Sequence, residues 1–160
     1  MSLLVIENVT KDYLAQGATV PALAGVSLFV EAGDFVALVG RSGCGKSTLL
    51  NLAGAMDFPS TGSVRIDGAE TRQMDDDALT ALRRQKIGFI FQNFQLLPTL
   101  SVAENVELPL LLAGAGGVRE RAIEALQWVE LGGFENRMPH QLSGGQMQRC
   151  LLYTSDAADE

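Results

Sequence analysis

A run of eight residues, Gly40 to Ser47, constrains this chain more than any other part of its sequence. It reads GRSGCGKS and fits the pattern GxxxxGK[ST], in which glycines let the backbone form a concave nest of N–H groups around phosphates. Lys46 adds a point charge for the outer phosphates, and the Ser47 hydroxyl is suited to hold Mg²⁺. The motif predicts nucleoside triphosphate binding; the alternative is a plain glycine turn. The predicted binding residues are Gly40, Arg41, Ser42, Gly43, Cys44, Gly45, Lys46, Ser47 and Thr48.

The segments on either side of this loop predict a strand and a helix. Phe35 to Val39 reads FVALV, a short apolar run typical of a strand buried on both faces of a parallel sheet. From Lys46 the residues favour a helix that stops near Pro59 to Gly62. We predict further strands over 3–9, 24–30, 63–66 and 86–91, with a turn at Asp67-Gly68 after the third of these. We predict helices over 75–85, from 101 and over 118–131, and the helix from 101 should open with a capping box of Ser101 and Glu104. Alternating strands and helices indicate an α/β fold.

Charge and composition exclude several classes of protein. The 160 residues carry a net charge of −7, which argues against nucleic acid as the partner, because that binding needs clustered Lys and Arg. No apolar run reaches the length of a membrane span, and the N-terminal residues lack a secretory pattern, so we expect a cytoplasmic protein. Cys44 and Cys150 are expected to be free thiols. Within the loop, Cys44 is expected to be a small filler rather than a reactive group.

A second glycine cluster, Leu142 to Gln146, reads LSGGQ and precedes a segment that can begin a helix. Alone it is weak and is more typical of an ordinary loop. Together with the phosphate loop, it resembles the signature motif of the ATPase subunit of ATP-binding cassette (ABC) transporters. The stretches IGFIFQNFQLLPTLSVAENVELPL and NRMPHQLSGGQMQR are most similar to the lipoprotein-releasing and macrolide-export group, with a cell-division ATPase as a close relative.

The resemblance implies a P-loop ATPase fold of three parts. These are an N-terminal antiparallel β subdomain, a parallel core sheet and an α-helical signature subdomain over about residues 93–145. Residues 1–149 would form a partial ATP-binding domain that is incomplete at its C-terminus. The last eleven residues, 150–160, hold three acids and no base, depart from the helix that the family continues there, and resemble a translated sequencing adapter. We therefore expect them to be a non-native tail.

The resemblance also implies roles for single residues, with ATP and Mg²⁺ as cofactors. Tyr13 would stack on adenine, the alternative being a core tyrosine at a strand end. Gln92 would reach Mg²⁺ and the attacking water, the alternative being a surface glutamine. Lys46 and Gln92 are thus the predicted catalytic residues, and Ser47 and Gln92 the metal ligands. The signature residues that would close the partner's site in trans are Leu142, Ser143, Gly144, Gly145 and Gln146.

For the whole protein, the resemblance implies a homodimer of ATPase subunits that docks on integral membrane permease subunits at the inner face of the cell membrane. No Walker B strand with its catalytic glutamate follows Arg149. We therefore expect these residues alone to hydrolyse ATP hardly at all. Two rival functions stay open. One is a soluble ABC-type ATPase acting in cell division or on DNA or ribosomes, and the other is a module that senses ATP without hydrolysing it.

Overall fold

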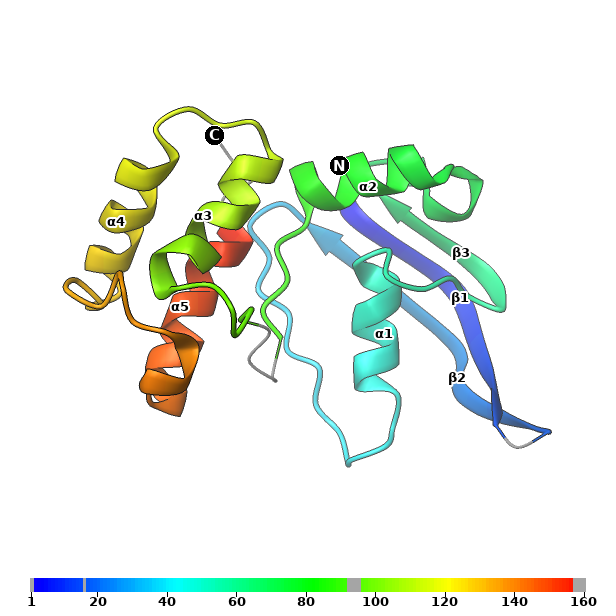
Figure 1. The fold of residues 1–160 in the computed structure, drawn as a ribbon. Coiled ribbons are helices and arrows are strands. Elements are labelled where there is room, and N and C mark those ends of the chain that lie inside the picture. The colour runs from blue at the N-terminus through cyan, green and yellow to red at the C-terminus, as the bar shows by residue number, and fades with distance from the viewer. Residues whose placement is uncertain (1, 16, 92–95, 157–160) are drawn as a thin grey trace. The chain divides into compact units, whose positions relative to one another are not determined.

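A computed structural model describes residues 2–15, 17–91 and 96–156 of the chain. The backbone divides into two compact units, residues 1–81 and 82–160. The first unit carries the strands and the phosphate loop, and the second is helical (Figure 1). Helix α2 (Asp76–Lys86) begins in the first unit and ends in the second.

The first unit is built on a four-stranded antiparallel sheet in the order β2-β1-β3-β4. Two long strands, β1 (Ser2–Ala15) and β2 (Ala18–Glu31), form a hairpin, and β3 (Thr61–Ile66) pairs with the other edge of β1. The short β4 (Ala69–Glu70) follows a two-residue turn in which Asp67 and Gly68 both have positive φ, 49° and 80°. Such turns match the twist of paired strands, which explains why Asp-Gly occurs here.

Helix α1 (Lys46–Ala53) packs on this sheet and closes the core of the first unit (Figure 1). Its two inward leucines, Leu49 and Leu52, are four and seven positions from the helix N-cap, Gly45, so they share one face. The buried cluster consists of Ile6, Val9, Leu23, Leu49, Leu52 and Val64. The helix that follows the phosphate loop is therefore fixed to a hydrophobic sheet.

The second unit packs α3 (Val102–Leu112), α4 (Val118–Trp128) and α5 (Gly144–Asp156) around one apolar core. The predicted capping box at the start of α3 is present. The Ser101 hydroxyl accepts from the Glu104 amide at 3.3 Å, and the Ser101 amide donates to the Glu104 carboxylate at 2.7 Å. Hydrogen bonds to the Glu104 carboxyl, first from the Ser101 amide and then from the Ser101 side chain, lower its pKa because they favour the charged form.

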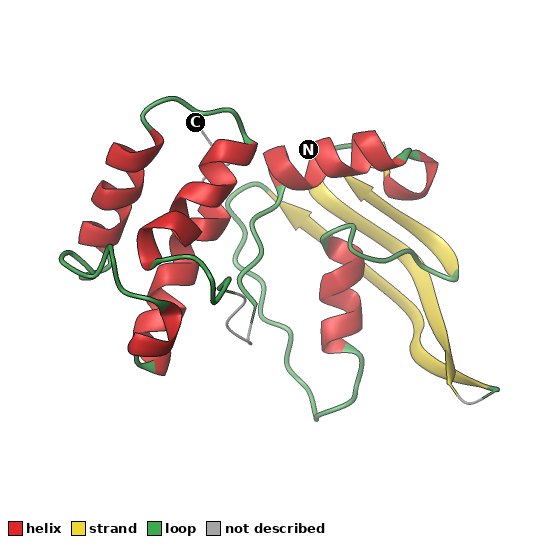
Figure 2. Cartoon of the chain, in the orientation of Figure 1, coloured by secondary structure: helices red, strands yellow, loops and turns green. Residues whose placement is uncertain are grey.

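Two strands predicted from apolar runs are wrong. Phe35 to Val39 forms no strand and is drawn as loop in Figure 2, with the side chains of Phe35 and Val39 97% and 93% exposed. Residues 87–91 are likewise irregular, and Lys86 ends α2. A strand needs a neighbour for its backbone hydrogen bonds, and the sheet of the described residues pairs neither segment. Among the described residues the sheet is thus antiparallel, without the expected parallel core.

From the sequence we expected residues 150–160 to depart from the helix that precedes them. The structure differs, because the helix continues past Arg149. Helix α5 continues to Asp156, and the side chains of Cys150 and Leu151 lie in the core of the second unit. Two expectations stay predictions: that residues 150–160 are a non-native tail, and that the helical signature subdomain spans about residues 93–145. Both cysteines are free thiols, Cys44 exposed and Cys150 buried. In the part of the chain that is described, no helix has the length and apolarity to cross a membrane.

Candidate functional site: a phosphate loop, an anchored tyrosine and a capped signature helix

The backbone between β2 and α1 needs glycine at the point where the helix starts. Gly45 is the N-cap of α1 with φ of 91°, a conformation that L side chains rarely adopt. A Cβ there would lie 2.5 Å from the Ala22 carbonyl oxygen and 2.9 Å from Leu23 Cδ2, both on β2. A Cβ on Gly40 would lie 2.7 Å from Cys44 Sγ, so the loop folds back closely on itself. The start of α1 is thus held against β2 by a close approach that only glycine allows.

Lys46 folds back over this loop. Its Nζ donates to the carbonyl oxygens of Gly40 at 2.9 Å and Arg41 at 2.8 Å, and lies 3.6 Å from Cys44 Sγ. The ammonium group therefore sits inside the loop that the motif assigns to phosphates. Its hydrogen-bonding partners are two backbone carbonyls and the Cys44 sulfur, neutral groups that bind a cation less strongly than an anion does.

The N-terminus of α1 is available to an anion. No side chain caps it, and no acidic residue lies in the first turn of this helix. Its leading N–H groups and the positive end of the helix dipole therefore attract negative charge, and Lys46 adds to the same field. Ser47 is exposed and Thr48 half-buried in this turn. The described residues thus fit a triphosphate with its Mg²⁺, which commonly takes a hydroxyl, phosphate oxygens and waters as ligands.

Tyr13 lies near the end of β1, with its side chain tied by polar contacts. Its hydroxyl donates to Asp57 Oδ2 at 2.9 Å, and Lys11 Nζ lies 5.0 Å from the centre of its ring. Lys11 Nζ also donates to Asp57 Oδ1 at 2.6 Å and to the Phe58 carbonyl at 2.7 Å. The ring is 39% exposed, so Tyr13 is not the core residue that the alternative interpretation required.

The Asp57 carboxylate is kept charged by these neighbours. Partial burial is the largest single effect and raises its pKa. The hydrogen bonds from Lys11, the Phe58 amide and Tyr13, together with the Lys11 charge, lower the pKa by more than burial raises it, so the net pKa lies below the usual value. Lys11 and Asp57 were missed in the sequence. Lys11 could have been found from its position two residues before Tyr13, because side chains two positions apart on a strand lie on the same face. Asp57 had none, because it is 44 residues from Tyr13 in the chain.

The signature residues form the start of α5 in the second unit. Leu142 is buried in the core, and Ser143 stands before the helix. The Ser143 hydroxyl accepts from the Gln146 amide at 3.3 Å, and the Ser143 amide donates to Gln146 Oε1 at 2.8 Å. This reciprocal pair is a capping box, in which the glutamine of LSGGQ is the partner of its serine. Gly144 and Gly145 are exposed in the first turn.

One residue not predicted from the sequence fixes this helix to its neighbour. Arg149 Nη1, on α5, donates to the Val129 carbonyl at 2.9 Å and to Glu130 Oε2 at 3.1 Å, just after the end of α4. The carbonyl bond satisfies a backbone group that the helix end leaves without an intrahelical partner. The signature turn is thus positioned by a buried leucine, a capping box and this arginine.

The structure brings the phosphate loop and Tyr13 into the first unit and the signature into the second. Gln92, predicted as a catalytic and metal-binding residue, lies outside the described residues. In the described ranges no group of three or more His, Cys, Asp or Glu side chains could hold a metal ion.

Comparison with known proteins gives relatives over nearly the whole chain. MJ0796 of Methanocaldococcus jannaschii, an ABC transporter ATP-binding protein, is 47% identical over 156 residues, covering 94% of this chain and 66% of the relative. The macrolide export ATP-binding/permease protein MacB of Syntrophobacter fumaroxidans is 48% identical, covering 95% of this chain and 22% of the relative. The chain thus spans about two thirds of MJ0796 and under a quarter of MacB.

Solved structures give the same result. The dimeric structure of MJ0796 bound to ADP and Pi, described as a post-hydrolysis state, superposes with a TM-score of 0.90 and 45% identity over 97% of this chain and 69% of that one. A second dimeric structure of the same cassette matches equally well. The family model described as ABC transporter matches residues 23–155, from within β2 to the last turn of α5. The phosphate loop and the capped signature helix both fall in this range, and the chain belongs to the ABC transporter family as its ATPase domain.

Proposed function

We propose that this domain binds and hydrolyses ATP to power export or release of a substrate through membrane permease subunits. The observation that carries the proposal is the phosphate cradle, where a glycine-lined loop, an uncapped helix N-terminus and Lys46 converge on one place. Its likeness to MacB, whose name gives macrolide export, supports an export function. The cargo itself is selected elsewhere, since these residues address phosphates.

Lys46 would act by exchanging partners. In the structure its ammonium group bonds two backbone carbonyls, and on binding it would turn to the outer phosphates. Hydrogen bonds between two charged groups are stronger than those with a neutral acceptor, so the exchange favours binding. Mg²⁺, held by Ser47 and Gln92, would neutralise the charge that develops on the phosphates. Gln92 would also orient the attacking water.

Tyr13 would complete the nucleotide site by stacking its ring on adenine. Aromatic rings stack on bases through dispersion and burial of apolar surface, and a partly exposed ring on the same unit as the cradle is available for this. In the proposal the base lies on Tyr13 and the phosphates lie at Gly40 to Thr48. The nucleotide would thus bridge the end of β1 and the start of α1.

The signature would close the site of a second copy. Its exposed serine and glycines at a helix start provide a second seat for phosphate, and MJ0796 has been solved as a dimer with ADP and Pi. We propose a homodimer of ATPase subunits in which ATP joins each phosphate loop to the partner's Leu142 to Gln146. The assembly would lie in the cytoplasm at the inner face of the cell membrane, attached through its permease partners.

Hydrolysis needs a group near the γ-phosphate that positions water or takes its proton. The rival functions in cell division, on DNA or ribosomes, or as an ATP sensor use the same cradle. The net charge of −7 argues against a role on nucleic acid, because that binding is driven by clustered Lys and Arg.

Calorimetric titration with MgATP tests the proposal. Lys46→Ala should weaken binding at least tenfold, by about the 1.5–3 kcal/mol that a hydrogen bond to a charged group contributes. Lys86→Ala removes the same charge from the end of α2 and should leave the affinity unchanged. Equal affinities for all three proteins would refute a phosphate site at this loop. Sedimentation with and without MgATP tests the dimer, which should form only with nucleotide.

A further inference from the structure

The contacts around Tyr13 point beyond stacking to the residue that holds it. We infer that Asp57 is a positioning residue for the nucleobase, because its carboxylate anchors the Tyr13 ring so that the ring forms a preset platform for a purine. The inference rests on the proposed function, since it requires that Tyr13 meets the base. Asp57 itself would touch neither base nor phosphate.

Both oxygens of the Asp57 carboxylate are engaged, each by a different side chain from β1. Oδ2 accepts from the Tyr13 hydroxyl at 2.9 Å, and Oδ1 accepts from Lys11 Nζ at 2.6 Å. Oδ1 also accepts from the Phe58 amide at 2.7 Å, which fixes the carboxylate to its own backbone. Lys11 Nζ closes the triangle, 5.0 Å above the centre of the Tyr13 ring.

This triangle restricts the Tyr13 ring in two ways. The bond at the hydroxyl sets the direction of the side chain, and the cation on one face favours an orientation in which that face is turned toward Lys11. A base can then stack only on the other face. Because the ring loses little further freedom on binding, less of the stacking energy is spent on ordering it.

The position of Asp57 in the chain links this platform to the phosphate cradle. It follows α1, which ends at Ala53 and whose first turn carries Lys46, Ser47 and Thr48. The helix is fixed to the sheet by Leu49 and Leu52. The anchor of the ring and the seat of the phosphates thus belong to one rigid helix and the turn after it. A nucleotide that spans both would find them at a fixed separation.

The experiment compares two ligands of the full protein, MgATP and Mg-tripolyphosphate, by calorimetric titration. Tripolyphosphate keeps the phosphate chain and lacks the base, so it reports on the cradle alone. Tyr13→Phe removes the anchoring hydrogen bond, and Asp57→Asn removes the charged carboxylate that binds Tyr13 and Lys11 at once. Both keep the size of the side chain. Each should raise the Kd for MgATP about three- to tenfold and leave that for tripolyphosphate within about twofold, as expected for loss of one such hydrogen bond.

Two further variants complete the comparison. Tyr13→Ala removes the platform and should raise the MgATP Kd at least as much as Asp57→Asn. Glu7→Gln is the matched control, because Glu7 lies on the same strand and forms an ion pair with Arg65 across β1 and β3, away from Tyr13. It should change neither Kd. The double variant Tyr13→Phe with Asp57→Asn should bind MgATP like either single variant, because both lose the same contact.

The outcomes separate the inference from the function on which it rests. If Tyr13→Ala leaves the MgATP Kd unchanged, Tyr13 does not meet the base, and the inference fails together with the proposed adenine stacking. The phosphate site is judged separately, by Lys46→Ala. If Tyr13→Ala weakens MgATP binding while Asp57→Asn and Tyr13→Phe do not, the platform stands and the anchoring role of Asp57 is overturned. Weakening of tripolyphosphate and MgATP alike would show that Asp57 acts on the cradle through the fold, which also overturns it. Should Asp57→Asn fail to fold, Tyr13→Phe alone decides.

Discussion

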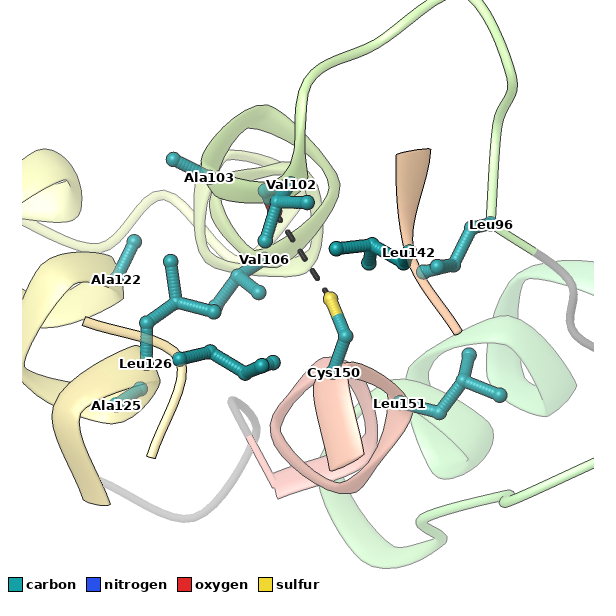
Figure 3. Packing of buried hydrophobic residues seen from close by; sticks show 11 residues of the cluster. Leu96, Val102, Ala103, Val106, Ala122, Ala125, Leu126, Leu142, Cys150 and Leu151 are labelled. Atoms are coloured by element: carbon teal, nitrogen blue, oxygen red, sulfur yellow. Dashed lines mark hydrogen bonds between the residues drawn. The ribbon is translucent and has the colours of Figure 1, made fainter. Parts of the chain in front are cut away.

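The buried thiol of Cys150 makes the stability of the second unit depend on alkaline pH in a way that can be calculated. Its side chain is fully buried (0% exposed), and in Figure 3 it points from α5 into the cluster that includes Val102, Val106 and Leu142. Its Sγ lies 4.0 Å from the Val102 carbonyl oxygen. Burial raises the pKa of this thiol from 9.0 to about 11, because the thiolate is disfavoured in an apolar environment.

The sign follows from comparing the folded and unfolded chains. Unfolding exposes the thiol and returns its pKa to about 9, so between pH 9 and pH 11 the unfolded chain loses this proton before the folded one does. The contribution of this thiol to the free energy of unfolding is therefore unchanged below pH 9 and falls as the pH rises toward 11. At 1.36 kcal/mol per pKa unit, the loss between pH 8 and pH 10 is about 1.3 kcal/mol.

Urea unfolding followed by far-UV circular dichroism at pH 8 and pH 10 measures this loss. Both proteins carry Cys44→Ser, which removes the exposed thiol, and one also carries Cys150→Ala. Titration of lysines and tyrosines is common to both and cancels in the comparison. The protein with Cys150 should lose about 1.3 kcal/mol more than the Cys150→Ala protein. An equal loss in the two would refute the burial of Cys150 and with it the packing of α5 beyond Arg149.

Two further predictions concern the site. Gly45→Ala should lower the melting temperature clearly more than Gly33→Ala. Both glycines have positive φ, but only a Cβ on Gly45 meets backbone, at 2.5 Å from the Ala22 oxygen. Equal losses in thermal denaturation would contradict the close approach. Ser143→Ala and Ser101→Ala should each lower the free energy of unfolding in urea by about 1 kcal/mol, because each removes the hydroxyl of a capping box. An unchanged Ser143→Ala protein would mean that the signature helix is not capped this way.

Features of the fold that depend on neighbouring residues were predictable from the sequence. The capping box of Ser101 and Glu104 was found because its spacing reports a local geometry. The β3–β4 turn at Asp67 and Gly68 was found because the two left-handed positions of such a turn favour these residues. The start of α1 followed from the glycine loop in the same way. In each case the residues that form the contact lie within a few positions of one another.

The two wrong strands show where this reasoning ends. The run FVALV and the run KIGFIF predict that a segment is suited to burial in a sheet, but a strand forms only when another strand lies beside it. The sheet in the described residues is occupied by β1 to β4, which neither run joins. Phe35 and Val39 therefore remain exposed in spite of their sequence. Apolar composition is a property of the run, whereas pairing is a property of two segments distant in the chain.

The candidate site divides along the same line, and this bears on how ABC ATPase domains can be analysed from sequence. LSGGQ alone was more typical of an ordinary loop and was assigned through the family resemblance, whereas the phosphate loop was predictable because its glycines indicate a local geometry. The Asp57 anchor was not, since its 44-residue separation from Tyr13 closes only through the pairing of β1 and the packing of α1. A motif therefore locates what binds the ligand. The contacts that set the geometry of the binding residues must be taken from the folded chain.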